Sequence, residues 1–265
     1  MDLREATGDQ ERRHPWEVAR ARHFLRAWDA LPIARGRVPV EVLDVGAGDA
    51  WFAAQLEAHA GRAGAGAHIT CVDAEYTDAD LRSLRRAHSA LRFDREVADR
   101  VADALFLLDV LEHVPNDYAF LRGLVRDHVR PGGYVLISVP AWPALYSAHD
   151  AFLRHYRRYT PAAARRLCAR SGLRLVRSGG LFASLLAPRA LARLLEQAPS
   201  WSRRAHPARG AAWTGGALLT GAVDAVLRAD SAASSWAASR GLPLPGLSWW
   251  AVCRVPSPHD EGGRA

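Results

Sequence analysis

A short apolar run at residues 40–45, followed at once by a glycine-rich turn, is the feature that most constrains the fold of this chain. The run is aliphatic and largely β-branched, as in a strand covered on both faces, with Val40, Val42, Leu43 and Val45. Gly46 and Gly48 permit backbone angles that a side chain would forbid, and they leave room for a ligand against the backbone. Asp49 can cap a following helix. A strand, a glycine turn and a helix N-terminus together predict a nucleotide-type site.

The spacing of the glycines separates the possible cofactors. A dinucleotide-binding turn has a third glycine, which lets the helix pack closely beside a pyrophosphate, and Trp51 stands at that position here. The indole therefore argues against NAD or FAD. The segment that starts at Asp44 instead resembles the first motif of class I S-adenosylmethionine (SAM)-dependent methyltransferases, with Ala50 where the last glycine of the motif usually stands. The resemblance implies that SAM is the cofactor and that it meets the backbone at Gly46 and Gly48, beside Asp44.

An acidic residue ends the second predicted strand. Residues 68–72 form a second β-branched, apolar run, and Asp73 follows it directly. Rossmann enzymes and SAM methyltransferases both bind ribose hydroxyls from this position. We therefore expect Asp73 to hold the ribose of the cofactor, the alternative being a plain turn aspartate.

A second motif follows the predicted fourth strand at residues 104–108. Residues 109–114 read D-V-L-E-H-V, which closely resembles a signature of many small-molecule methyltransferases. The resemblance implies that Asp109 and His113 lie near the cofactor, at the carboxyl ends of the strands where open α/β sheets bind ligands. The alternative is that Glu112 and His113 only cap a loop.

The alternation of strands and helices predicts the fold class. It is α/β, a doubly wound and mostly parallel seven-stranded sheet of the Rossmann-like methyltransferase type, with a helical insertion before the last strand. In such methyltransferases the last strand, expected here at residues 248–255, is antiparallel and lies between the fifth and sixth. The predicted divisions are an N-terminal helix and linker, a SAM-binding core, a helical insertion, and the last strand with a polar tail: 1–39, 40–178, 179–241 and 242–265.

The segment after the fifth strand is dense in groups that could act on an acceptor. S-x-H-D at residues 147–150 and H-Y-R-R-Y-T at 155–160 are similar to a recurrent motif in one branch of these methyltransferases. His149 is our first candidate for a general base because the pKa of imidazole is near neutrality, with Asp150 as its orienting partner and His155 as the alternative base. The competing interpretation is that these residues tie the loop to the sheet while the arginines of the motif are solvated.

The insertion at residues 179–241 has two interpretations. Its leucines form an apolar stripe that we expect to be broken at Pro188, and a second helix is expected at 211–227. The segment could be a lid over the acceptor, or an amphipathic surface that contacts a membrane peripherally or a partner chain. We favour the lid.

Composition excludes several classes of protein. The net charge of +7 and a pI near 10 would suggest nucleic acid, but the chain has no lysine and its arginines are dispersed, so we expect no nucleic-acid binding. Cys71, Cys168 and Cys253 are far apart, and we expect them to be reduced and buried, with no metal site. The N-terminal residues lack a secretion signal and no stretch is long enough to span a membrane, so we expect a cytoplasmic location.

The sequence therefore predicts a SAM-dependent methyltransferase that acts on a small-molecule acceptor, with the methylated atom (oxygen, nitrogen or carbon) left open. Two alternatives remain. One is a non-catalytic methyltransferase fold that acts through a membrane or protein partner, which the apolar insertion and Ala50 allow. The other is an NAD-dependent oxidoreductase, which Trp51 opposes.

Overall fold

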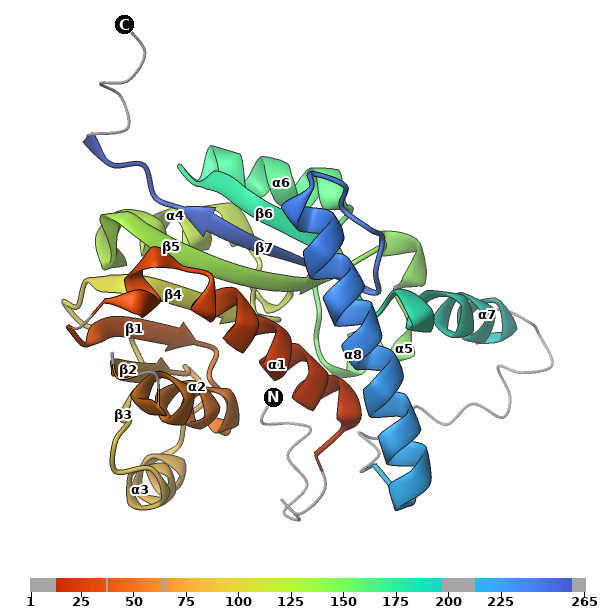
Figure 1. Ribbon diagram of the computed structural model, residues 1–265, viewed down its shortest axis with the longest axis horizontal. Coiled ribbons are helices and arrows are strands. Elements are labelled where there is room, and N and C mark those ends of the chain that lie inside the picture. The colour runs from red at the N-terminus through yellow and green to blue at the C-terminus, as the bar shows by residue number, and fades with distance from the viewer. Residues whose placement is uncertain (1–12, 37, 63, 65, 197–212, 259–265) are drawn as a thin grey trace, which may run out of the picture.

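The fold is built on one seven-stranded sheet, and the computed structural model describes it and its flanking segments over residues 13–36, 38–62, 64, 66–196 and 213–258 (Figure 1). The strands are β1 (Val40–Val45), β2 (Ala67–Val72), β3 (Arg92–Asp94), β4 (Ala102–Leu108), β5 (Val129–Pro140), β6 (Arg174–Leu181) and β7 (Ser248–Arg254). Their order is β3-β2-β1-β4-β5-β7-β6, and only β7 runs antiparallel to its neighbours. The predicted fold class and the position of the last strand are confirmed.

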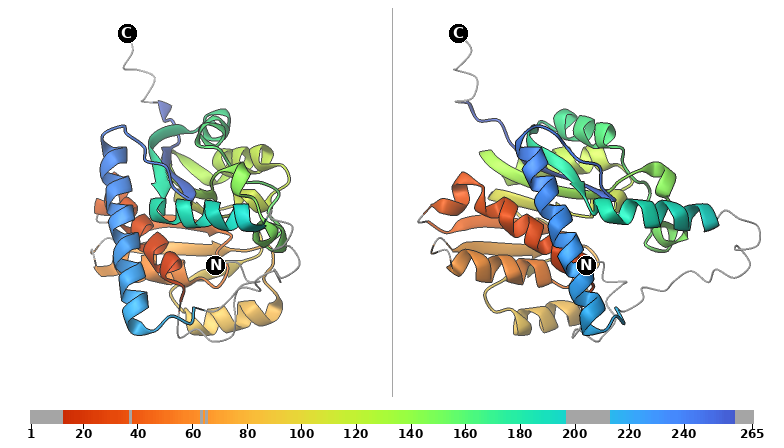
Figure 2. Two further views of the ribbon diagram at one scale, coloured as in Figure 1. Left: turned by 90° about the vertical axis from the view of Figure 1, so that its right-hand side faces the viewer. Right: turned by 45° about the vertical axis from the view of Figure 1, so that its right-hand side comes forward.

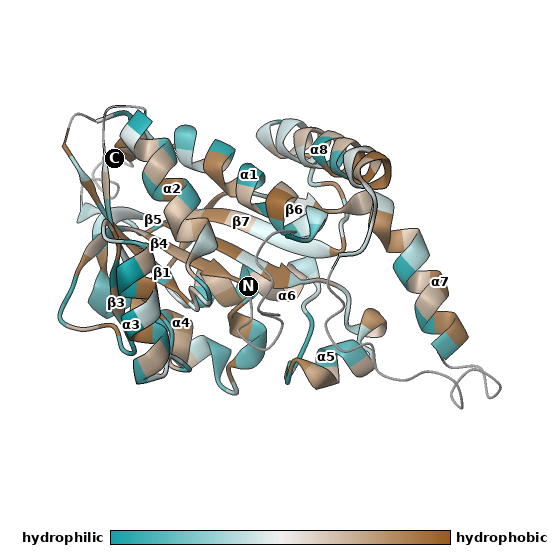
Figure 3. Ribbon diagram, turned by 90° about the horizontal axis from the view of Figure 1, so that it is seen from below, coloured by the Kyte–Doolittle hydropathy of each residue, from teal (hydrophilic) through white to brown (hydrophobic). Residues whose placement is uncertain are grey.

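Helices cover both faces of the sheet (Figures 1 and 3). One face carries α1 (Pro15–Asp29), α2 (Trp51–Arg62) and α8 (Ala217–Ser239), and the opposite face carries α4 (Asp117–His128) and α6 (Pro161–Arg170). The remaining helical segments are α3 (Asp78–Ala87), α5 (Ala148–Phe152), α7 (Leu186–Glu196) and the 3₁₀ turns η1 (Pro32–Arg35), η2 (Leu111–His113), η3 (Pro143–Leu145) and η4 (Ala183–Leu185). Each covering helix turns an apolar stripe to the sheet, which gives two buried clusters, one on each side.

Three predicted boundaries in the second half of the chain are wrong. β5 begins at Val129, ahead of the P-G-G segment, because Val129 pairs with Ala102 of β4, and Gly132 N donates to Val255 O on the other side. β6 continues to Leu181, so the first residues of the predicted insertion are strand. Pro188 does not break the apolar stripe, since it lies in the first turn of α7, where a missing N–H costs nothing.

The second helix of the insertion belongs to the layer that covers the sheet. α8 begins at Ala217 and ends at Ser239, later than predicted, and it packs against α1 and β6. Two serines of α8 form hydrogen bonds in this layer: Ser231 Oγ lies 3.0 Å from His23 Nδ1 of α1, and Ser234 Oγ accepts from Trp250 Nε1 of β7 at 2.9 Å. α7, by contrast, projects from the body of the molecule and has no buried residue (Figures 1 and 2).

Candidate active site

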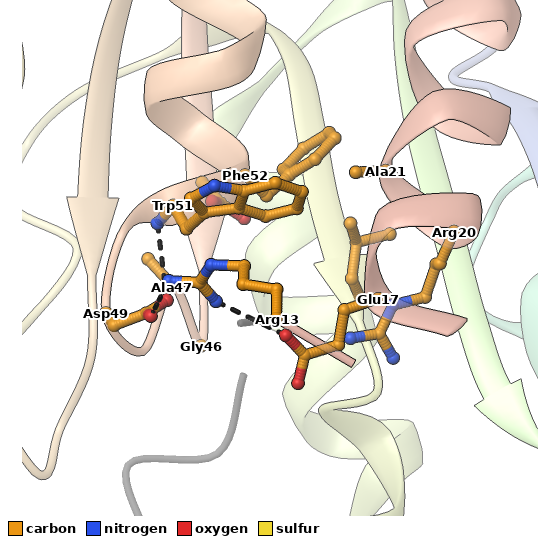
Figure 4. Close-up of a pocket in the computed structure, with 11 residues that line it drawn as sticks. Arg13, Glu17, Arg20, Ala21, Gly46, Ala47, Asp49, Trp51 and Phe52 are labelled. Carbon is orange, nitrogen blue, oxygen red and sulfur yellow. Dashed lines mark hydrogen bonds and ion pairs between the residues drawn. The ribbon is translucent and has the colours of Figure 1, made fainter. Parts of the chain in front are cut away.

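A pocket lies at the carboxyl ends of β1 and β4, between the glycine turn and the first turns of α1 (Figure 4). It is a partly open pocket in which charged side chains and backbone of the glycine turn face each other. Its walls are formed by Arg13, Glu17, Arg20, Ala21, Asp44, Gly46, Ala47, Asp49, Trp51, Phe52 and Leu108. Four of these residues come from α1 or the residues just before it, so the N-terminal helix forms one side of the pocket.

The glycine turn forms the floor of the pocket. Gly46 has φ of +75°, and a Cβ there would lie 2.5 Å from Val110 Cγ2, so both the conformation and the space exclude a side chain. Gly48 has φ of +55°, and its N–H donates to Asp73 Oδ2 at 3.0 Å. The structure therefore brings the turn and the predicted ribose residue together. Ala50 stands where the motif usually has its last glycine. Its φ is +59°, a left-handed backbone angle that glycine adopts easily, and the residue has no exposed surface.

Asp44 lies beneath the turn in an environment that opposes its charge. The side chain is 3% exposed, and burial, together with the nearby Asp73 carboxylate, raises its pKa to about 7 against the opposing charge of Arg20. A carboxyl that is half protonated near neutral pH is suited to a positively charged or hydrogen-bonding ligand, whose arrival would favour its ionised form.

Two arginines at the start of α1 close the pocket, and sequence reasoning did not single them out. Arg13 forms ion pairs with Asp49 and Glu17, and its guanidinium lies 4.6 Å from the centroid of the Trp51 ring. Arg20 forms an ion pair with Asp109. The sequence does contain a pattern that could have identified them, because positions 13, 17, 20 and 21 recur at helical spacing on one face of the helix.

The D-V-L-E-H-V segment leaves β4 at the edge of this pocket. Asp109 has φ of +58°, and its carboxylate accepts from Ser138 Oγ at 2.8 Å as well as from Arg20. Asp109 thus reaches the pocket through Arg20. His113 turns toward the loop after β5, where its ring centroid is 4.6 Å from that of His155. Glu112 is fully buried beside them.

The two candidate bases are separated by their surroundings. Asp150 accepts from Ser147, from His155 Nδ1 at 3.0 Å and from Arg158 at 2.7 Å, so the carboxylate orients His155. These donors hold the pKa of Asp150 well below its usual range despite burial. His149 lies in α5 apart from these contacts of Asp150, and burial lowers its pKa. The Asp150 pairing predicted for His149 is therefore formed with the alternative base.

The arginines of the H-Y-R-R-Y-T motif are engaged rather than solvated. Arg157 pairs with Asp117 at 3.0 Å, and Tyr159 Oη donates to the same carboxylate at 2.8 Å. Arg158 is bound to Asp150 with its side chain 8% exposed. These contacts fasten the loop to the start of α4, so most of the motif serves to position its remaining side chains.

Comparison with known proteins places the chain in a family. A family described as "Methyltransferase domain" matches residues 10–178, which covers the glycine turn, Asp73, the D-V-L-E-H-V segment and the H-Y-R-R-Y-T loop. The chain belongs to this methyltransferase-domain family. Its fold and family support a methyltransferase enzyme.

Curated relatives match part of this methyltransferase. The ubiquinone biosynthesis O-methyltransferases of Rickettsia prowazekii (strain Madrid E) and Rickettsia felis (strain ATCC VR-1525 / URRWXCal2) are 29% and 28% identical over 106 residues, which is 37% of this chain. The matched region spans 39% and 41% of the two relatives, so the chain covers about two fifths of their length.

Solved structures share the fold. A candidate sarcosine dimethylglycine methyltransferase from Galdieria sulphuraria has a TM-score of 0.54 at 13% identity, covering 89% of this chain and 86% of that chain. A SAM-dependent methyltransferase from Archaeoglobus fulgidus has a TM-score of 0.50 at 14% identity, covering 91% and 94%. At these identities the likeness concerns the fold alone.

Two further expectations concern the rest of the methyltransferase. Cys71, Cys168 and Cys253 are free thiols and buried, as predicted. Among the residues that the structure describes, no helix is both long and apolar enough to cross a bilayer.

Proposed function

We propose that this methyltransferase uses SAM to methylate a hydroxyl group of a small-molecule acceptor. The observation that carries the proposal is the hydrogen bond from Gly48 N to Asp73 Oδ2, which holds the acidic side chain after β2 against the glycine turn whose Gly46 lines the pocket. The names of the curated relatives, which are O-methyltransferases, support oxygen as the acceptor atom.

The residues of the pocket fit the parts of SAM. Gly46 carries no side chain between its backbone and the pocket, and Asp73 retains carboxylate lone pairs for the ribose hydroxyls. Arg13 offers a positive charge to the carboxylate of the amino-acid part, and Asp44 offers a negative charge to its ammonium. SAM, when bound, supplies a methyl group that is electrophilic because it is attached to a sulfonium.

The protein must then position the acceptor, exclude water and remove a proton. We propose that His149 accepts this proton. Burial and the nearby Arg189 lower the pKa of its imidazole, which keeps the ring neutral and able to accept a proton at physiological pH. His155, which Asp150 orients, is close enough to His149 for its charge to lower that pKa further. Both groups belong to the segment that leaves β5 toward the pocket side of the sheet.

The apolar acceptor region that we propose is α7. Leu191, Leu194 and Leu195 lie at helical spacing and are 58%, 66% and 42% exposed, while Arg189 of the same helix donates to Leu145 O of η3 at 3.4 Å. α7 therefore adjoins the loop that carries His149, and we propose that it covers an acceptor with an apolar portion. Peripheral membrane contact through the same leucines is the alternative.

A turnover assay with a panel of phenols, catechols and hydroquinones tests this function. The assay measures S-adenosylhomocysteine release from SAM. We expect Asp73→Ala to raise the KM for SAM by about tenfold or more, which is the loss of a charged hydrogen bond of about 1.5 kcal/mol or more. We expect His149→Ala to lower kcat with little change in that KM. Asp78→Ala, which removes an exposed carboxylate paired with Arg95, is the control.

Two results would contradict the proposal. An equal KM for SAM in the wild type and Asp73→Ala would remove the cofactor assignment. Release of no S-adenosylhomocysteine by a protein that binds SAM would favour a non-catalytic role.

A further inference from the structure

Three potential ligand groups meet beside the pocket, from two segments far apart in the sequence. Glu112 and His113 come from η2 after β4, and His155 comes from the loop after β5. One carboxylate oxygen and one ring nitrogen from each histidine lie within 4.8 Å of one another. The two imidazoles pack edge to face, with 84° between their planes.

Glu112 is the least explained group in this cluster. It is fully buried, and neither carboxylate oxygen has a hydrogen-bond partner among the described residues. A buried carboxyl without a hydrogen bond costs on the order of 1–3 kcal/mol, and such groups in native proteins usually have a ligand or a function.

The surroundings hold the cluster in place. Tyr156 N donates to Glu112 O at 2.7 Å, which joins the two segments directly, and His155 N donates to Asp150 O at 2.9 Å. His155 Nδ1 is bound to the Asp150 carboxylate at 3.0 Å, which leaves Nε2 for a second partner. A histidine whose far nitrogen donates to a carboxylate is the usual arrangement of a metal-binding imidazole.

We propose that Glu112, His113 and His155 form a binding site for a divalent transition-metal ion of the zinc class. Two imidazoles and one carboxylate suit Zn²⁺ and its first-row neighbours, whereas Mg²⁺ and Ca²⁺ prefer oxygen ligands alone. The site was not predicted from the sequence, which led us to expect no metal.

The geometry requires a modest closure. Ligand atoms about 2.1 Å from a tetrahedral ion lie about 3.4 Å apart, so separations of up to 4.8 Å must shrink by at most about 1.4 Å, which side-chain rotation can supply. Three protein ligands leave a fourth position for water or another oxygen.

The location connects the metal site to the proposed function. Arg20, which lines the pocket, forms an ion pair with Asp109, three residues before Glu112. The segment that carries Glu112 and His113 therefore begins at the edge of the pocket. A metal ion here would hold the acceptor hydroxyl and lower its pKa. This role rests on the proposed function, whereas the binding of the metal ion does not depend on it.

Titration of the untagged, EDTA-treated protein with Co²⁺ tests the metal site. The visible absorption of protein-bound Co²⁺ reports its coordination. Zn²⁺ is then added as a competing ion, and Mg²⁺ as an ion that should not compete. We expect one equivalent of Co²⁺ to bind, Zn²⁺ to displace it and Mg²⁺ to leave it in place. Glu112→Gln and His155→Asn should each weaken Co²⁺ by at least about tenfold, since loss of an outer partner alone costs about 10–100-fold.

His68→Ala is the matched control, because it removes an exposed histidine that also pairs with a carboxylate, Glu41 at 2.8 Å. Its Co²⁺ affinity should equal that of the wild type. No stoichiometric Co²⁺ binding, full affinity in the folded Glu112→Gln and His155→Asn proteins, or an equal loss in His68→Ala would overturn the proposal. S-adenosylhomocysteine binding by the same samples reports folding and tests the cofactor pocket separately.

Discussion

Replacement of Gly46 by alanine should destabilise the protein by about 2–4 kcal/mol. A left-handed alanine costs about 1–2 kcal/mol, partly offset by the chain entropy that glycine loses, which leaves about 1 kcal/mol. The new Cβ would also lie 2.5 Å from Val110 Cγ2. Val110 is β-branched and cannot easily rotate away, so this overpacking adds about 1–3 kcal/mol.

Gly172→Ala separates the two costs. Gly172 has φ of +85°, but a Cβ there would meet nothing within 4 Å, so this variant should lose only about 1 kcal/mol. Urea unfolding with linear extrapolation measures both variants, and Val110→Ala in the Gly46→Ala background should recover part of the loss. Equal destabilisation by the two glycine variants, or no relief from Val110→Ala, would refute the steric argument.

Three further predictions concern pH and the exposed helix. Burial first, and then Arg26 and Arg177, lower the pKa of His23 to about 3, so the unfolded state binds the extra proton and stability falls with acidification. Between about pH 6 and 4, the free energy of unfolding of the wild type should fall by about 1.4 kcal/mol per pH unit more than that of His23→Gln. Urea midpoints of the two proteins that change equally with pH would contradict this. Burial raises the pKa of Asp44 to about 7, so the folded protein loses stability as pH rises through about 7 and this carboxyl ionises. Asp44→Asn should therefore be more stable than the wild type at pH 8, and the difference in unfolding free energy should shrink toward pH 4.5. Leu194→Ser should leave stability within about 0.5 kcal/mol because the side chain is 66% exposed, but should raise the KM of an apolar acceptor, and binding of the wild type but not the variant to vesicles would instead favour membrane contact.

Local patterns in the sequence predicted the sheet. The β-branched runs and the glycine turn after β1 determine their conformation within a few residues, and parallel βαβ connections allow few topologies. The antiparallel position of β7 came from the family resemblance rather than from the residues. Boundaries were less certain because sheet pairing, as at Gly132, extends strands beyond their apolar runs.

The site depended on contacts that the sequence does not encode locally. Glu112 and His155 are more than forty positions apart, and only the shared edge of β4 and β5 brings them together. Asp150 is adjacent to His149, but its place in the first turn of α5 directs the carboxylate to Ser147, His155 and Arg158. The packing of α8 on α1 was hidden because serines rather than leucines form part of that contact.

Isothermal titration with S-adenosylhomocysteine tests the central claim most directly. The account predicts micromolar binding by the wild type and by Asp78→Ala, and affinity lower by about ten- to a hundredfold in Asp73→Ala, the range that a charged hydrogen bond of about 1.5–3 kcal/mol implies. Asp73 should matter because its carboxylate accepts from Gly48 of the glycine turn and is the group that we propose for the ribose hydroxyls. No heat of binding from the folded wild type, or equal affinity in Asp73→Ala, would contradict the assignment of this pocket to the cofactor.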